Sequence, residues 1–200
     1  MSVARVRDAY AARAGEYIAV VGSIEHAADQ DREYVLAWAR GVGGHIIDVG
    51  CGPGQWTNYL RERGVDVEGV DPVPEFIDDA RRRYPDAAYR IGHADRLDVE
   101  DASLGGVLSW YSLIHTDPDE IDALLTEFAR AIRPGGGLAV GFFEGPEPAP
   151  FDHAVTTAYF WPVDLLSSRI EQAGFVVSDT QTRTDPGRRR HGAITALRRH

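Results

Sequence analysis

Three closely spaced glycines follow the first strongly apolar run of this 200-residue chain. The segment IIDVGCGPGQW places Gly50, Gly52 and Gly54 after a predicted strand and before a predicted helix. Glycine at such a turn lets the backbone bend sharply and approach a ligand without a Cβ in the way. The spacing is GxGxG, whereas dinucleotide-binding turns carry GxGxxG. The turn alone is compatible with a ligand site or with a tight strand-to-helix connection that binds nothing.

Acidic residues end the next two predicted strands. The segment EGVDP ends the second strand at Asp71, where a carboxylate can accept hydrogen bonds from both hydroxyls of a ribose. The alternative for Asp71 is a surface acid before a turn proline. The third strand ends in GHAD, which places Asp95 where it can read an adenine amino group. Because ligands bind beyond the carboxyl ends of parallel strands, these neighbouring strand ends together predict a nucleoside site.

Alternating strands and helices position these groups. Apolar periodicity, caps and stop signals predict helices over residues 3–15, 29–40, 55–63, 74–84, 117–133 and 163–175. The same signals predict strands over residues 45–50, 65–71, 87–95, 104–112, 137–145, 176–184 and 191–200, and a proline-rich loop over residues 145–157. The alternation is typical of βαβ units, so we expect an α/β fold with a mostly parallel sheet covered by helices on both faces.

The composition restricts the class of protein. Apolar residues make up 44% of the chain and charged residues 26%, which is ordinary for a soluble globular domain. The formal charge of -10 argues against tight non-specific nucleic-acid binding, which needs clustered cations. No run approaches the roughly 18 apolar residues of a membrane span, and a single cysteine excludes an intrachain disulfide. We therefore expect a cytoplasmic protein without nucleic-acid or membrane partners, as a monomer or homodimer.

The chain resembles the class I S-adenosylmethionine-dependent methyltransferases of the small bacterial type. The matching pieces are IIDVGCGPG, VEGVDPVPEFI, IGHADRLDVED, VLSWYSLIH, ARAIRPGGGLAV and LLSSRIEQAGFVV, and they extend over nearly all of the chain. The resemblance implies a Rossmann-like, doubly wound seven-stranded sheet whose last strand is antiparallel. It implies a single domain over residues 1–200, with residues 1–40 as an N-terminal helical lid. S-adenosyl-L-methionine would be the cofactor and S-adenosyl-L-homocysteine the product.

The resemblance also assigns roles to individual residues. Asp48 and residues 50–54 would hold the amino-acid end of the cofactor, and Asp71 would bind its ribose. Pro72 and Ile77 would flank the adenine. The complete cofactor-binding set that we expect is Tyr10, Arg13, Tyr17, Asp48, Gly50, Cys51, Gly52, Gly54, Trp56, Asp71, Pro72, Ile77, Ala94, Asp95, Ser109 and Trp110. Within this set Ala94 and Asp95 recognise the adenine edge, Ser109 and Trp110 line the floor, and the first three residues belong to the lid.

Candidate catalytic residues lie after the fourth and fifth strands. His115 is a candidate general base, because a histidine there can take a proton from an acceptor hydroxyl or amine. A pocket wall and a cap of the following helix are the alternatives for this residue. Glu144 ends the fifth strand and is a second candidate. Trp110 and Tyr111 are adjacent along a strand, so at most one of them is expected to face the pocket.

The segment after the fifth strand indicates the kind of acceptor, and the spacing of the histidines indicates whether a metal site is expected. His153 and the aromatic residues 159–161 lie in the segment that usually covers such a site, which suggests a flat or apolar acceptor, with core packing as the alternative. The seven histidines form no HxH or HxxxH pair, so no metal site is expected.

The predicted reaction is in-line transfer of a methyl group to an O, N or C nucleophile of a small-molecule acceptor. The sulfonium is already a good leaving group, so the protein must mainly align the acceptor and exclude water. A non-catalytic module that binds S-adenosylmethionine is one alternative. An NAD-dependent oxidoreductase on a related fold is another, although GxGxG and the lack of lysine count against it.

Overall fold

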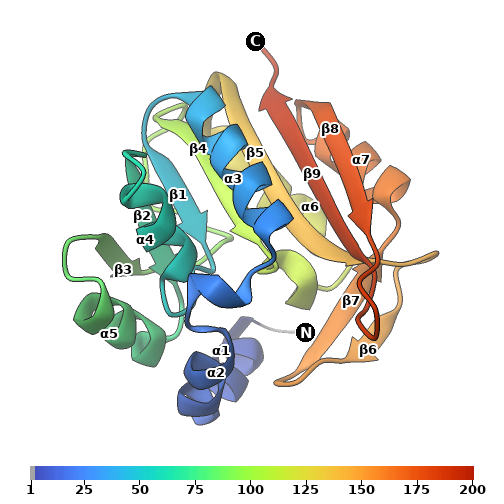
Figure 1. Cartoon of the computed structure of the whole chain (residues 1–200). Helices are drawn as coiled ribbons and strands as arrows, with labels where there is room; N and C mark the ends of the chain where they lie inside the picture. Colours follow the sequence, from blue (N-terminus) through green and yellow to red (C-terminus); the bar gives the residue numbers. More distant parts are fainter. Residues whose placement is uncertain (1–2) are drawn as a thin grey trace.

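One mixed sheet runs through the computed structural model, which describes residues 3–200 (Figure 1). Residues 1–2 of the predicted domain and lid lie outside the described residues. The strands are β1 (Ile46–Val49), β2 (Val67–Asp71), β3 (Ala88–Ile91), β4 (Leu104–Trp110), β5 (Ile132–Glu144), β6 (Pro150–Asp152), β7 (Thr157–Trp161), β8 (Phe175–Arg183) and β9 (His191–Arg198). The first five pair in parallel in the order β3-β2-β1-β4-β5. Strand β9 follows beside β5 and is antiparallel to both β5 and β8.

This arrangement confirms the predicted α/β fold with its antiparallel last strand. The seven predicted strands correspond to β1–β5, β8 and β9. The sheet has nine strands because β6 lies within the segment predicted as a loop, and β7 begins at the last residue of that segment and continues to Trp161. Strand β7 pairs in parallel with the end of β5 at Phe143 and Glu144. Phe143 also pairs with β9, so β7 occupies the side of β5 that β4 leaves free after Trp110.

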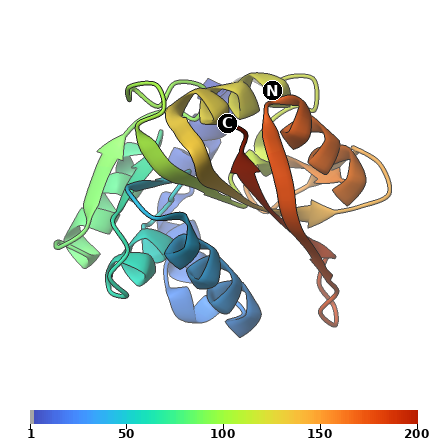
Figure 2. The same ribbon diagram turned by 90° about the horizontal axis from the view of Figure 1, so that it is seen from above.

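Helices cover both faces of the sheet (Figure 2). They are α1 (Val3–Ala12), α2 (Ala14–Val21), α3 (Asp29–Val42), α4 (Gln55–Arg61), α5 (Pro74–Arg83), α6 (Ile121–Ala131) and α7 (Val163–Gln172), with short 3-10 turns η1 (Ile24–His26) and η2 (Leu113–His115). Alternate strand residues divide between two apolar layers. Ile46 belongs to the apolar cluster that includes residues of α3 and α4, whereas Ile47 belongs to the cluster that includes residues of α6 and α7.

Two predicted helices differ from the observed ones. The helix predicted over residues 3–15 is broken at Arg13, whose φ of -123° and ψ of 19° separate α1 from α2. The helix predicted over residues 117–133 ends at Ala131, because Ile132 is already extended and pairs with Leu104 of β4.

The predicted lid divides into two parts. Helices α1 and α2 lie at the carboxyl ends of the parallel strands (Figure 1). They pack on Val73 and Phe76 at the start of α5. Helix α3, in contrast, contacts β4 and β5 and buries Val35 and Ala39 in the apolar layer of the sheet. Residues 29–40 are therefore part of the sheet's cover, and only the first two helices lie over the strand ends.

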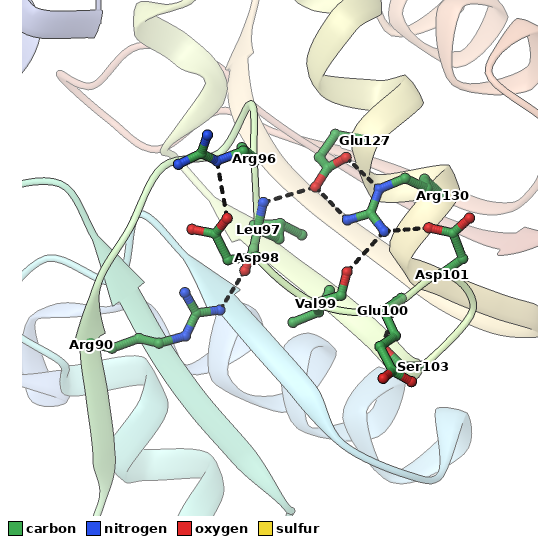
Figure 3. A network of polar contacts seen from close by, with 10 residues as sticks. All are labelled: Arg90, Arg96, Leu97, Asp98, Val99, Glu100, Asp101, Ser103, Glu127 and Arg130. Atoms are coloured by element: carbon green, nitrogen blue, oxygen red, sulfur yellow. Dashed lines mark hydrogen bonds and ion pairs between the residues drawn. The ribbon is translucent and has the colours of Figure 1, made fainter.

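The segment between β3 and β4, which carries Asp95, is held against α6 (Figure 3). The Glu127 carboxylate accepts a hydrogen bond from the Leu97 backbone N–H at 2.8 Å. Arg130 donates to the Val99 carbonyl at 2.9 Å. These bonds satisfy backbone groups that no strand pairs, so a segment without regular structure keeps one conformation beside the ends of β2 and β3.

The glycine turn after β1 depends on a close approach between two backbones. Gly50 has a φ of +70°, and a Cβ at this position would lie 2.3 Å from the Cβ of Ser112. The left-handed conformation strains a residue with a Cβ, and the contact leaves no room for one. Glycine is therefore required here for both conformation and space.

We predict that Gly50→Ala lowers the free energy of unfolding by about 2–4 kcal/mol, the sum of backbone strain and overpacking. Gly64→Ala is the matched control, because Gly64 has a φ of +80° and open space around its Cβ position. It should lose only the strain of about 1 kcal/mol. Chemical denaturation of both variants measures the difference, and equal losses would show that the contact with Ser112 carries no cost.

Candidate functional site

Two cavities lie beyond the carboxyl ends of the parallel strands. The smaller has a volume of about 160 Å³ and is lined from β1, β2 and the residues after β3. The larger has a volume of about 600 Å³ and extends from the glycine turn to the start of β9. The residues that line both cavities are Tyr10, Tyr17, Gly50, Gly52 and Tyr111. The two cavities are therefore neighbouring parts of one site.

The smaller cavity brings the predicted strand-end residues together. The predicted residues that line it are Tyr10, Tyr17, Gly50, Gly52, Asp71, Pro72, Ala94 and Asp95. Asp71 is 5% exposed, and its Oδ2 accepts a hydrogen bond from the Gly52 N–H at 2.9 Å. Its Oδ1 accepts from the Val73 N–H at 2.8 Å. Burial raises the pKa of this carboxyl to about 6, although both hydrogen bonds oppose the shift.

The larger cavity is lined by a second buried carboxylate, Asp48, which lies in β1 just before the glycine turn. The predicted residues that line it are Tyr10, Arg13, Tyr17, Asp48, Gly50, Cys51, Gly52, Trp56 and Trp110. Asp48 is 2% exposed and accepts a hydrogen bond from the Thr57 hydroxyl at 2.7 Å. Burial raises the pKa of Asp48 to about 7, and the nearby Asp71 carboxylate adds to this shift. Burial also raises the pKa of the Cys51 thiol, which keeps it protonated.

Three predicted cofactor-binding residues line neither of these cavities. Ile77 is fully buried in an apolar cluster with Cys51 and Tyr89. Gly54 accepts a hydrogen bond through its carbonyl from the Tyr89 hydroxyl at 3.0 Å, behind the turn. The Ser109 hydroxyl lies 2.6 Å from that of Ser112. Of these two serines, Ser112 lines the smaller cavity, three residues beyond the position that we expected.

His115 lines the smaller cavity with both ring nitrogens engaged. Its Nδ1 lies 2.8 Å from the Thr157 carbonyl, which can only accept, so Nδ1 carries the proton. Its Nε2 then accepts from the Tyr10 hydroxyl at 2.7 Å. Burial lowers the pKa of His115 to about 4. His115 lies within η2, and α6 begins only at Ile121, so the helix-cap interpretation is wrong and the geometry favours the pocket wall.

Glu144 lies at the end of β5 and lines neither cavity. Its Oε2 is 2.7 Å from the Nε of Arg190, and its side chain is 20% exposed. The structure therefore places this carboxylate in an ion pair with the segment between β8 and β9, and it is not among the residues that line the two cavities.

The backbone at the end of β4 breaks the expected alternation. Tyr111 has a φ of +59°, and both Trp110 and Tyr111 line the larger cavity. The prediction that at most one of them faces the pocket is wrong, because alternation holds only while the backbone remains extended. No sequence signal marks this left-handed residue, since tyrosine rarely adopts that conformation.

The N-terminal helices are tied to the site by polar contacts. Besides Tyr10 and His115, the Arg13 guanidinium donates a hydrogen bond to the Ala154 carbonyl. Arg83 donates to the Gly22 carbonyl at 2.8 Å, just after α2. Helices α1 and α2 therefore close over both cavities in this structure.

Within residues 3–200, no three His, Cys, Asp or Glu side chains are grouped so that they could hold a metal ion. No helix in this part of the chain is long and apolar enough to cross a membrane.

Comparison with known proteins gives a family for this arrangement. The family model described as "Methyltransferase domain" matches residues 46–136, from the start of β1 into β5. The match covers less than half of the 200-residue chain, and it shows that this segment is similar to methyltransferase domains. The resemblance that the sequence motifs suggested is thereby confirmed.

Curated relatives match about half of the chain. An uncharacterized methyltransferase of Mycobacterium tuberculosis is 37% identical over 95 residues, which cover 48% of this chain and 38% of the relative. A demethylmenaquinone methyltransferase of Beutenbergia cavernae is 36% identical over 110 residues, which cover 55% of this chain and 45% of the relative. The matches thus span less than half of the length of these relatives.

A solved structure extends the similarity of fold to the whole chain. The 1,6-didemethyltoxoflavin-N1-methyltransferase of Burkholderia thailandensis superposes with a TM-score of 0.78 at 21% identity. The superposition covers 100% of this chain and 92% of the other. The strands and helices on both sides of the matched segment therefore belong to the same fold.

We predict that Tyr10→Phe loosens α1 and α2, because the buried Nε2 of His115 loses its donor. An unsatisfied buried acceptor costs about 1–3 kcal/mol. Hydrogen exchange of residues 3–21 should become faster than in the native chain. Tyr59→Phe is the control, since the Tyr59 hydroxyl makes only a 3.4 Å contact with the Arg32 carbonyl. Unchanged exchange of residues 3–21 in Tyr10→Phe would show that this hydrogen bond does not hold the lid.

Proposed function

We propose that the protein transfers the methyl group of S-adenosylmethionine to a small-molecule acceptor. The observation that carries the proposal is the Asp71 carboxylate, which is buried at the end of β2 and lines the smaller cavity. Each of its oxygens accepts one backbone N–H and retains a lone pair. A buried carboxylate with spare acceptor capacity suits the two hydroxyls of a ribose.

The residues around Asp71 fit the rest of the cofactor. Pro72, Ala94 and Asp95 form the wall of the same cavity, where they would contact the adenine. Asp48, beyond the glycine turn in the larger cavity, would hold the amino-acid end. Tyr10 and Tyr17 line both cavities and would cover the cofactor from the lid. These roles are proposals that rest on the chemistry of the side chains present.

The bound cofactor supplies a methyl group on a positively charged sulfur, which is already a good leaving group. The chain must then align the acceptor and keep water out, which raises the effective concentration of the two reactants. Closure of α1 and α2 over both cavities supports water exclusion. Neither candidate catalytic residue has a supported role in proton transfer. Glu144 forms an ion pair with Arg190, and both ring nitrogens of His115 are hydrogen-bonded.

A small-molecule acceptor is supported by the larger cavity. Its volume of about 600 Å³ lies within the usual range of roughly 300–1,000 Å³ for small-molecule pockets. The methyltransferases reported above include ones named for demethylmenaquinone and 1,6-didemethyltoxoflavin. The cytoplasmic location, the lack of a nucleic-acid partner and the monomeric or homodimeric state stay predictions from the sequence.

We predict that Asp71→Asn weakens S-adenosylhomocysteine binding by about 2 kcal/mol, or roughly 30-fold, because two charge-assisted hydrogen bonds become weaker. Isothermal titration calorimetry measures this change. Asp86→Asn is the control, because the Asp86 side chain is exposed and its ion pair with Arg61 is long, at 3.9 Å. NADH should not compete with S-adenosylhomocysteine. Binding of NADH alone would favour the oxidoreductase instead.

We predict that S-adenosylhomocysteine affinity falls as the pH decreases through the pKa values of the two buried carboxyls. Both must be ionised to accept hydrogen bonds from the ligand, and their pKa values are about 7 for Asp48 and about 6 for Asp71. The loss should begin near pH 7 and steepen below pH 6, approaching about tenfold per pH unit for each protonated group. In Asp71→Asn only the upper step should remain. A flat profile between pH 8 and pH 5 would contradict the assignment.

A further inference from the structure

A tyrosine and a histidine meet on the far wall of the larger cavity. The Tyr111 hydroxyl lies 2.5 Å from Nδ1 of His191, and Nε2 of His191 lies 4.0 Å from the Asp185 carboxylate. Tyr111 follows β4, whereas His191 begins β9, and these strands flank β5 on opposite sides. All three side chains line the larger cavity. The fold thus brings these ionisable side chains together, although Tyr111 and His191 are 80 residues apart in the sequence.

Tyr111 is held at the boundary between the two cavities by a strained backbone. Its φ of +59° is unfavourable for a residue with a Cβ, and such strain costs about 1–3 kcal/mol. A hydrogen bond from its N–H to the Gly141 carbonyl at 3.0 Å and a ring contact with Phe143 at 5.1 Å maintain this conformation. Strained residues concentrate at functional sites, so the conformation of Tyr111 is consistent with a functional role for its side chain.

Charged groups surround His191 on several elements. Asp31 of α3 forms an ion pair with Arg183 of β8 at 2.5 Å, and Arg183 also contacts Asp185 at 3.0 Å. Burial and the neighbouring Arg183 and Arg188 lower the pKa of His191, while Asp31 and Asp185 oppose the shift. A neutral imidazole has a free lone pair on one nitrogen. In the tautomer that carries its proton on Nε2, the nitrogen nearer Asp185, the Tyr111 hydroxyl donates to Nδ1. An imidazolium formed at this position would face the two carboxylates.

A row of aromatic rings forms the adjoining wall. Ring centroids are 5.7 Å apart for Trp56 and Trp110, 5.8 Å for Trp110 and Tyr111, and 5.1 Å for Tyr111 and Phe143. All four rings line the larger cavity. The planes of neighbouring rings are inclined by 60°, 90° and 52°, so the wall presents ring edges and ring faces with which a flat, unsaturated molecule can make edge-to-face contacts.

We infer that the larger cavity binds a planar aromatic acceptor bearing an acidic O–H or N–H group, and that the Tyr111–His191 pair removes its proton. The inference rests on the proposed function, in which the adjoining glycine turn holds the methyl donor. The acceptor proton passes to Tyr111 Oη while the Tyr111 proton passes to His191 Nδ1. The acceptor heteroatom uses its lone pair to bond the methyl carbon, and the electron pair of the broken C–S bond stays on sulfur. Asp185 stabilises the resulting imidazolium.

His115 does not fill this role in the structure. Its Nε2 also accepts from a tyrosine, Tyr10, but its Nδ1 donates to the neutral Thr157 carbonyl. The corresponding nitrogen of His191 lies 4.0 Å from the Asp185 carboxylate, which can stabilise a positive charge. It also lines only the smaller cavity, among the residues that suit a nucleoside. His191 lines only the larger cavity, and a proton received from Tyr111 would leave it facing carboxylates.

The probe for this inference is 4-nitrophenol, whose phenolate absorbs visible light and whose phenol does not. It is titrated into the chain saturated with S-adenosylhomocysteine, at a pH below the pKa of the free probe. We expect the bound probe to show the phenolate band in the native chain. In His191→Gln the phenolate fraction should fall by about tenfold, because a charge-assisted partner is lost. Tyr111→Phe, which interrupts the relay, should show the same loss.

Matched controls separate this outcome from others. His45→Gln alters a partly exposed histidine beside Asp66, which lines neither cavity, and should leave the phenolate band unchanged. The methyl ether 4-nitroanisole has no proton to lose and should bind all forms without a new band. S-adenosylhomocysteine affinity is measured first and must be retained in His191→Gln and Tyr111→Phe. A native chain that does not bind S-adenosylhomocysteine would contradict the proposed function instead of this inference. A cofactor-bound chain that binds no 4-nitrophenol, or that gives equal phenolate fractions in native chain and His191→Gln, would overturn the inference.

Discussion

The pair of backbone hydrogen bonds to Asp71 is the constraint on which the site depends. One comes from Gly52 in the turn after β1, and the other from Val73 in the turn after β2. The carboxylate is buried, so losing either donor would leave a charged oxygen without a partner, at a cost of several kcal/mol. The two bonds therefore fix the glycine turn relative to the wall of the smaller cavity. They also keep the carboxylate in place for a ligand, because its position does not depend on the ligand's presence.

This constraint explains why one half of the site was predictable from the sequence. Strands β1, β2 and β3 are neighbours both in the chain and in the sheet, so residues at their ends meet without long-range information. Asp71, Asp95 and the glycine turn could therefore be placed together from motif spacing alone. The exceptions are informative, since Ile77 and Ser109 are adjacent to the site in sequence but point into packed interior.

The acceptor half was less predictable because long-range pairing builds it. Strand β7 can form because β5 continues past the end of β4. The backbone of Phe143 and Glu144 is therefore unpaired on the β4 side and pairs with β7 there. Short strands of this kind carry no periodic signal of their own, and the surrounding prolines suggested a loop. His191 reaches the site only through the pairing of β9 with β5, and Tyr111 reaches it through a backbone conformation that propensity argues against. Sequence patterns report local preference, whereas these placements are decided by the sheet.

The lid connects the two halves, and its attachment limits how the site can open. The buried apolar contacts of α1 and α2 are few: Tyr10 and Ala14 pack on Val73 and Phe76. The Tyr10 hydroxyl adds one buried hydrogen bond, to the neutral His115. Segments with so few buried contacts open at a lower free energy than a packed sheet. Because Tyr10 lines both cavities, its departure would expose the nucleoside side and the acceptor side together, so donor and acceptor would gain access through one movement.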